Sequence, residues 1–124
     1  MFLKCDFAGV AGAKYRNKEM RHVIRNRWIV SEEYRKLSIS ILQENLASLR
    51  AKIGITQEEI ANIIGVTRQT YYAIETKKRA MTWNTYLSLI FLFDAVSDTK
   101  EMIRELSIYP IDLVMRFNNK TIGD

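Results

Sequence analysis

Apolar residues after position 40 recur with the period of an α-helix. The first such set, at intervals of four, three and four residues, is Leu42, Leu46, Leu49 and Ile53. This spacing places the four side chains on one helix face. Ser40 and Gln43 stand three residues apart in the pattern of a capping box, which predicts that the helix begins there. Gly54 follows the last apolar position and is expected to end the helix in the left-handed conformation.

Two shorter amphipathic stretches follow, within the segment TQEEIANIIGVTRQTYYAIETKKR at residues 56–79. Thr56 and Glu59 form a second capping-box pattern, which predicts a short helix through the following isoleucines. Gly65 ends this stretch and supplies a residue that tolerates a positive φ angle.

Thr67 is placed to cap a third helix, over residues 67–76, directly after the glycine turn. Its apolar positions are Tyr71 and Ile74, together with the small Ala73. Two short helices joined by a turn of three or four residues containing glycine are typical of a helix-turn-helix. Such a pair exposes the start and one whole face of its second helix.

The remaining chain predicts three more elements. Thr82 can cap a helix from Trp83 to about Ala95. Asp98 with Glu101 indicates a helix over about 98–107, and Pro110 is suited to the first position of a last short helix near 111–117. Residues 86–93 are apolar on nearly every side of their helix, which requires burial all round. We expect either the 98–117 segment or a second copy of the chain to cover them.

Residues 1–37 lack a clear period. They are interpreted as a basic N-terminal arm, with either some helix after Ser31 or a strand pair around Val23 and Ile29. The sequence therefore predicts an all-α fold, a compact bundle of about five helices that contains a helix-turn-helix and carries the arm. We expect three parts: the arm at 1–37, the helix-turn-helix domain at 38–95 and a C-terminal helical extension at 96–124.

Composition narrows the class of protein. The chain has 124 residues, 48% of them hydrophobic, which is enough for one modest core. Its single cysteine, Cys5, forms no internal disulfide, and no run of residues reaches the ~18 apolar positions of a membrane span. We therefore expect a cytoplasmic protein without membrane attachment. His22 and Cys5 are too few for a structural zinc site, so neither a metal nor a cofactor is expected.

The formal charge of +5 is unevenly distributed. Residues 1–36 hold nine Lys and Arg against four Asp and Glu, and residues 46–81 hold six against three. Residues 82–124 instead hold four basic against six acidic residues. A basic excess around the predicted helix-turn-helix is suited to a polyanionic partner.

Beyond these patterns, the segment resembles the Xre/Cro-type helix-turn-helix regulators, the lambda-repressor-like family. The resemblance covers about residues 41–95 and rests on four motifs: L-x-x-L-R at 46–50, G-I-T-Q-E-E-I-A at 54–61, I-G-V-T-R-Q-T at 64–70 and I-E at 74–75. It implies that helix 67–76 is a recognition helix entering the major groove. It also implies a partly buried ion pair between Arg50 and Glu75. Lys77 departs from the family, which often has glycine there.

The resemblance assigns roles to individual residues. Arg68 and Gln69 are the candidates for base readout, by pairing with guanine and adenine respectively. Phosphate contacts and the exposed helix face complete the expected DNA-binding set, which comprises Gln57, Thr67, Arg68, Gln69, Thr70, Tyr72, Ala73, Lys77 and Lys78. Gln57 is also placed to brace Gln69.

The leading interpretation is a sequence-specific regulator of transcription that binds double-stranded DNA, a repressor that binds an inverted repeat as a homodimer. The alternative is a protein-interaction module, such as the antitoxin of a toxin–antitoxin pair, which binds a protein partner. A third interpretation gives the basic arm its own contacts along the minor groove or the phosphates. No catalytic triad or nucleotide-binding loop is present in the sequence, so we do not expect an enzyme.

Overall fold

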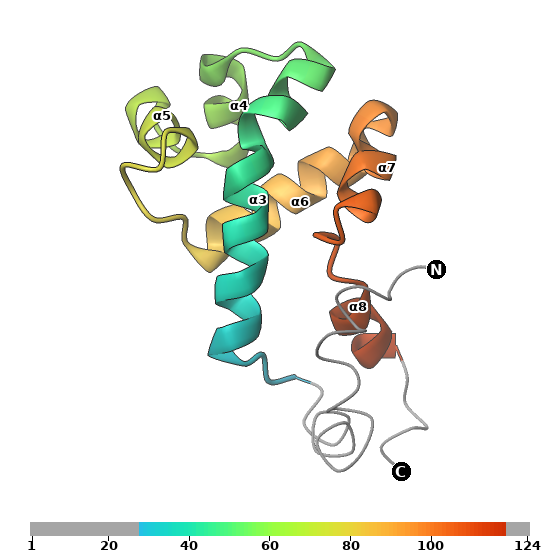
Figure 1. Ribbon diagram of the computed structural model, residues 1–124. Helices are drawn as coiled ribbons and strands as arrows, with labels where there is room; N and C mark the ends of the chain where they lie inside the picture. The colour runs from blue at the N-terminus through green and yellow to red at the C-terminus, as the bar shows by residue number, and fades with distance from the viewer. Residues whose placement is uncertain (1–27, 119–124) are drawn as a thin grey trace.

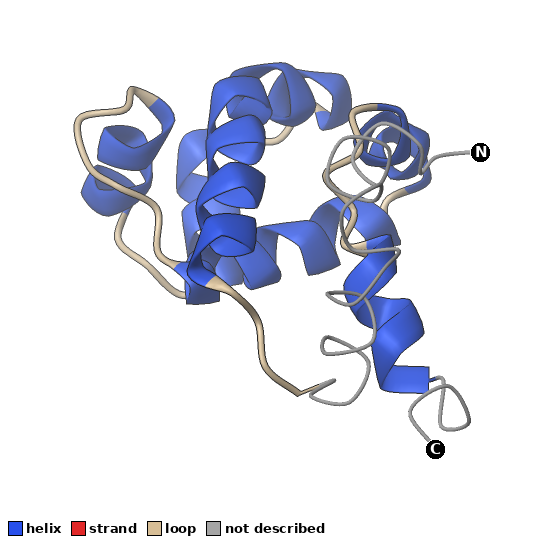
Figure 2. Ribbon diagram, turned by 60° about the horizontal axis from the view of Figure 1, so that its bottom comes forward, coloured by secondary structure: helices blue, strands red, loops and turns tan. Residues whose placement is uncertain are grey.

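The computed structural model describes residues 28–118, and all regular structure in this part of the chain is helical (Figures 1 and 2). The helices are α3 (Glu32–Ile53), α4 (Gln57–Ile64), α5 (Arg68–Glu75), α6 (Trp83–Ala95), α7 (Ser97–Glu105) and α8 (Ile111–Asn118). The prediction of an all-α bundle is confirmed. Val23 and the rest of the arm up to residue 27 lie outside the described residues.

Helix α3 is longer than the sequence predicted. It begins at Glu32, where the Ser31 hydroxyl accepts a hydrogen bond from the Tyr34 amide, and runs without interruption to Ile53. The predicted start at Ser40 is therefore wrong, because Ser40 and Gln43 lie inside the helix. Of the two alternatives for the preceding segment, helix after Ser31 is confirmed, and Ile29 is not in a strand.

The other helix boundaries at the helix-turn-helix follow local sequence signals. Thr56 and Glu59 form the predicted capping box, and the hydroxyls of Thr67 and Thr82 accept hydrogen bonds from amides three residues later. Gly54 and Gly65 end their helices with φ angles of 81° and 82°. At these two positions any other residue would have to adopt the left-handed backbone conformation, which only glycine adopts without cost.

The hydrophobic core lies where α3 crosses α6, with α4, α5 and α7 packed around the crossing (Figure 1). Its fully buried side chains include Leu42, Leu46, Leu49, Ile60, Tyr71, Tyr86, Leu89, Phe93 and Ile103. Each side chain of this size stabilises the fold by about 1.5–3 kcal/mol when it leaves water. Helix α5 lies on one side of α3, and α7 and α8 lie on the other.

The apolar helix α6 is covered on one face by its own chain. Helix α7 packs against it, and the buried Tyr86 hydroxyl donates a hydrogen bond to the Ile108 carbonyl at 2.6 Å. Phe93 is fully buried by the same arrangement. On the opposite side, Leu87 and Phe91 remain 40% and 76% exposed. The apolar character of α6 is thus only partly explained by packing within the chain.

Both predicted C-terminal helices are present, and only details of their starts differ from the prediction. Helix α7 begins at Ser97, and its first turn has no capping side chain, so Asp98 is not the cap. Instead, the buried Thr99 hydroxyl donates a hydrogen bond to the Phe93 carbonyl at the end of α6. Helix α8 begins at Ile111, one residue after Pro110. It lies beside the segment that precedes α3, because Arg116 donates a hydrogen bond to the Ile29 carbonyl.

Candidate nucleic-acid interface

Helices α4 and α5 pack against each other around the turn at Gly65. The Ala61 carbonyl accepts hydrogen bonds from the amides of both Gly65 and Val66, at 2.9 and 3.0 Å. Ala61 is itself buried, and its small side chain lets the two helices approach closely. The turn therefore fixes the direction in which α5 leaves α4.

Helix α5 has one buried and one exposed face. Tyr71 and Ile74 are buried in the core, as the sequence predicted. Arg68, Gln69 and Tyr72 are exposed, and Ala73 is half-buried between the two faces. An eight-residue helix with this division presents its N-terminal end to solvent and is anchored through its other side.

Arg68 and Gln69 are the two long polar side chains at the exposed end of α5. Within residues 28–118 neither side chain makes a hydrogen bond or an ion pair. Thr67 and Thr70 are engaged with each other, because their hydroxyls lie 2.9 Å apart and Thr67 caps the helix. The unengaged pair is thus available for a ligand, while the threonines set the start of the helix.

The other side chains predicted to contact DNA, apart from Ala73, interact with neighbouring residues of the chain. The Lys78 ammonium lies 5.8 Å from the centre of the Tyr72 ring, in a cation–π arrangement. The Lys77 ammonium forms an exposed ion pair with Glu44 at 2.7 Å. Gln57 is half-buried and lies close enough to the Glu75 carboxylate to help Arg50 lower its pKa.

The predicted ion pair between Arg50 and Glu75 is present. The guanidinium donates to both carboxylate oxygens, at 2.9 and 3.0 Å, and also to the Ile55 carbonyl at 3.1 Å. Burial alone would raise the pKa of Glu75, but the hydrogen bonds and charge of Arg50, helped by the nearby side chains of Tyr71 and Gln57, outweigh it and the pKa is lowered. The pair ties the end of α5 to α3 and to the segment before α4.

Tyr71 lies next to this ion pair. Its buried hydroxyl makes no hydrogen bond of ordinary geometry with the described residues, although it is near the Glu75 carboxylate. Burial and the nearby negative charge raise the pKa of Tyr71, so the hydroxyl stays protonated. The tyrosine therefore acts as a large core side chain, and its position under α5 supports the exposed face.

One contact that supports the site was not found in the sequence. The Gln43 side-chain amide donates to the carbonyls of Ile74 and Arg79, at 2.8 and 3.0 Å, and so holds the loop after α5 against α3. Arg79 in this loop, which the sequence places in the same basic cluster as Lys77 and Lys78, is exposed. The double hydrogen bond of Gln43 spans more than thirty positions of the chain, and only folding brings the partners together.

Exposed cations lie at the two ends of α5: Arg68 at its start, and Lys78 and Arg79 in the loop after it. A short helix anchored on a core, with an exposed N-terminal end and exposed cations at both ends, is the arrangement typical of helix-turn-helix DNA-binding domains. Residues 46–82 match the helix-turn-helix family model of the Xre/lambda-repressor-like type, which confirms the resemblance seen in the sequence. This family is a DNA-binding, non-catalytic type of domain.

Searches of curated proteins and of solved structures gave no match. Within residues 28–118 there is no helix long and apolar enough to cross a membrane. The same residues contain no group of three or more His, Cys, Asp or Glu that could hold a metal ion. His22 and Cys5 lie outside this part of the chain.

Proposed function

We propose that the protein is a sequence-specific transcriptional repressor that binds an inverted repeat in double-stranded DNA as a homodimer. The observation that carries the proposal is the exposure of Arg68 and Gln69 at the start of α5, above a helix face anchored by Tyr71 and Ile74. Arginine donates in a bidentate manner to guanine O6 and N7, and glutamine pairs with adenine N6 and N7.

Phosphate contacts position the recognition helix without reading sequence. Lys77 and Lys78 carry this role after α5, and Gln57 and Thr67 carry it at the starts of α4 and α5. The hydrogen bonds of Gln43 to the loop after α5 support this assignment, because they hold the lysines in a fixed position. Tyr72 and Ala73 complete the surface that faces the groove.

Dimer formation is supported by the exposed Leu87 and Phe91, which lie one turn apart on α6. A second copy of the chain packed on this face would bury both side chains. Two recognition helices related by a two-fold axis read two half-sites about one helical turn (~34 Å) apart.

Selection of bound DNA from a random pool, followed by sequencing, tests sequence preference and symmetry together. We expect an inverted repeat. Arg68→Ala and Gln69→Ala should each relax preference at one base position, at a cost of about 1–3 kcal/mol per half-site. Lys100→Ala, on the exposed side of α7, is the matched control and should leave the selected sequence unchanged. Full affinity and preference in both α5 variants would show that the readout assignment is wrong.

A protein-interaction module of the antitoxin type remains the second candidate. It is supported by exposed apolar side chains away from α5: Trp28, 68% exposed and stacked on Phe117, and Met115, 60% exposed. Surfaces of this kind often contact a protein partner. Purification from the native host tests it, since a stable heterocomplex that Trp28→Ser and Met115→Ser both disrupt is expected only of this candidate.

A further inference from the structure

The first turns of α3 extend beyond the matched helix-turn-helix and carry basic side chains on the side where the α5–α6 loop lies. Lys36, Ser40 and Glu44 follow one another at intervals of four residues and so share one face of α3. Glu44 on that face is bonded to Lys77 of the loop at 2.7 Å. Lys36 therefore lies on the loop side of α3, about 12 Å along the helix from Glu44 at 1.5 Å per residue.

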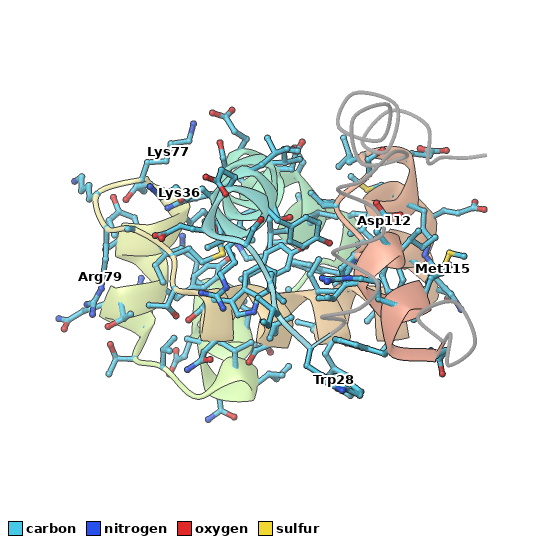
Figure 3. All side chains as sticks on the ribbon, turned by 90° about the horizontal axis from the view of Figure 1, so that it is seen from below. Trp28, Lys36, Lys77, Arg79, Asp112 and Met115 are labelled. Atoms are coloured by element: carbon cyan, nitrogen blue, oxygen red, sulfur yellow. The ribbon has the colours of Figure 1, made fainter. Side chains whose placement is uncertain are left out.

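The basic side chains of α3 and of the loop point to the same side of the molecule. Seen along α3 from below, Lys36, Lys77 and Arg79 project to one side of the molecule, and Asp112 and Met115 of α8 lie on the other (Figure 3). Lys36 and Arg79 are exposed, and within residues 28–118 their side chains form no ion pair.

Arg35 adjoins the same region. Its guanidinium lies 5.9 Å from the centre of the Trp83 ring, at the first residue of α6 directly after the loop. This contact leaves the charge exposed and holds it beside the start of α6. Arg35, Lys36 and Arg79 together are called the α3 strip below.

Acidic residues are distributed differently. Five of the carboxylates belong to the last turns of α6 and to α7 and α8, away from the strip: Asp94, Asp98, Glu101, Glu105 and Asp112. Near the strip, the Glu44 charge is matched by Lys77, and the exposed Glu32 and Glu33 lie about one turn before Lys36 without an ion pair to it within residues 28–118. The strip thus retains a positive excess where it continues the basic border of α5.

We propose that the α3 strip is a second phosphate-binding surface, which contacts the DNA backbone beyond the segment read by α5. This inference rests on the proposed binding of double-stranded DNA and adds contacts outside the helix-turn-helix. A distance of about 12 Å along α3 corresponds to three or four base pairs at 3.4 Å each. The strip therefore lengthens the contacted duplex by at most about that amount on one side of each half-site.

The test measures affinity for a selected duplex by fluorescence anisotropy as a function of salt concentration. Each lost phosphate contact should reduce the slope of log K against log salt by about 0.9 and weaken binding roughly five- to tenfold at 50 mM salt. We expect these changes in Lys36→Ala and in Arg35→Ala, with the selected sequence unchanged. Lys100→Ala is the control for loss of one positive charge elsewhere.

Duplex length gives an independent measurement. Removal of the outer three or four base pairs flanking the half-site should weaken DNA binding by the wild-type chain. It should not weaken DNA binding by the Arg35→Ala/Lys36→Ala double variant. If the folded double variant kept the wild-type salt slope and the wild-type dependence on flanking base pairs, phosphate binding by the α3 strip would be wrong. The proposed function would remain intact. An equal effect of Lys100→Ala, or altered base preference in Lys36→Ala, would also overturn phosphate binding by the α3 strip. Absence of any duplex binding by the wild-type chain would overturn both proposals.

Discussion

Arg50 and Glu75 join α3 to the end of α5 through a bidentate ion pair. The Glu75 side chain is only 8% exposed, whereas that of Arg50 is 24% exposed. A pair of this kind is costly to break, because removal of one partner leaves the other charge poorly solvated. The ion pair between Lys77 and Glu44 has a similar length but is exposed on both sides.

These two ion pairs should differ in their contribution to stability. Glu75→Gln should lower the free energy of unfolding by about 2 kcal/mol, less than a fully buried pair loses because Arg50 keeps some contact with water. Glu44→Gln, the matched control, should lower it by less than about 0.5 kcal/mol. Urea unfolding followed by circular dichroism measures both. Equal effects of the two substitutions would show that burial does not make the Arg50–Glu75 pair costlier to break than the exposed pair.

The lowered pKa of Glu75 also predicts how stability depends on pH. Because the pKa is lower in the folded than in the unfolded state, the stabilisation is complete above the ordinary value of 4.5. It is lost as the pH falls through the lower pKa of the folded protein. Urea midpoints measured from pH 6 to pH 3 should therefore decline less steeply in Glu75→Gln than in the wild-type chain. An equally steep decline in both chains would contradict the lowered pKa of Glu75.

Helix α5 ends at a turn in which Lys77 stands where glycine is common in the helix-turn-helix family. Its φ angle is 66°, in the left-handed region. The amides of Lys77 and Lys78 donate to the carbonyls of Ile74 and Ala73, which is the hydrogen-bond pattern of a Schellman motif. The turn is therefore formed at the cost of backbone strain, about 1–2 kcal/mol for a residue with a side chain.

Lys77→Gly should relieve this strain. Lys77→Ala is its matched control, since both substitutions remove the exposed ion pair with Glu44 but only glycine tolerates the positive φ angle. We expect the glycine variant to be more stable than the alanine variant by about 1 kcal/mol in urea unfolding. A glycine variant no more stable than the alanine variant would show that the turn rearranges instead of remaining strained.

The boundaries that could be predicted from the sequence are those set by neighbouring residues. A threonine cap bonds an amide three residues away, and Gly65 relieves a steric conflict within its own backbone, so both signals are local. The face of α5 that is exposed followed from the spacing of Tyr71 and Ile74. The resemblance to the family supplied the pairing of Arg50 with Glu75, which lie 25 positions apart.

The start of α3 could not be predicted in this way. Ser40 and Gln43 have the spacing of a capping box, but the chain before them continues the helix and Ser31 is the cap. The role of Gln43 depends on the carbonyls of Ile74 and Arg79, which reach it only after α5 has packed on α3. Local spacing therefore could not distinguish a helix cap from a contact between distant segments.

Alanine substitutions distinguish the two starts of α3. Ser31→Ala should lower the free energy of unfolding by about 1 kcal/mol, because it removes the acceptor for the Tyr34 amide. Ser40→Ala should have little effect or stabilise slightly, since Ser40 is an exposed residue inside the helix and alanine is the better helix former. A loss of stability in Ser40→Ala and none in Ser31→Ala would instead indicate that the helix begins at Ser40.

The exposed face of α6 predicts where the proposed homodimer forms. Phe91 is 76% exposed although it follows Ile90 and precedes Leu92 in an otherwise apolar helix. Phe91→Ser should shift the chain from dimer to monomer in sedimentation equilibrium and weaken binding to a two-half-site duplex, with binding to a single half-site unchanged. Met115→Ser on α8, at an apolar position that is 60% exposed, is the matched control and should remain dimeric. A dimer that persists in Phe91→Ser and dissociates in Met115→Ser would place the interface at α8, because only contacts buried between the two copies respond to loss of an apolar side chain.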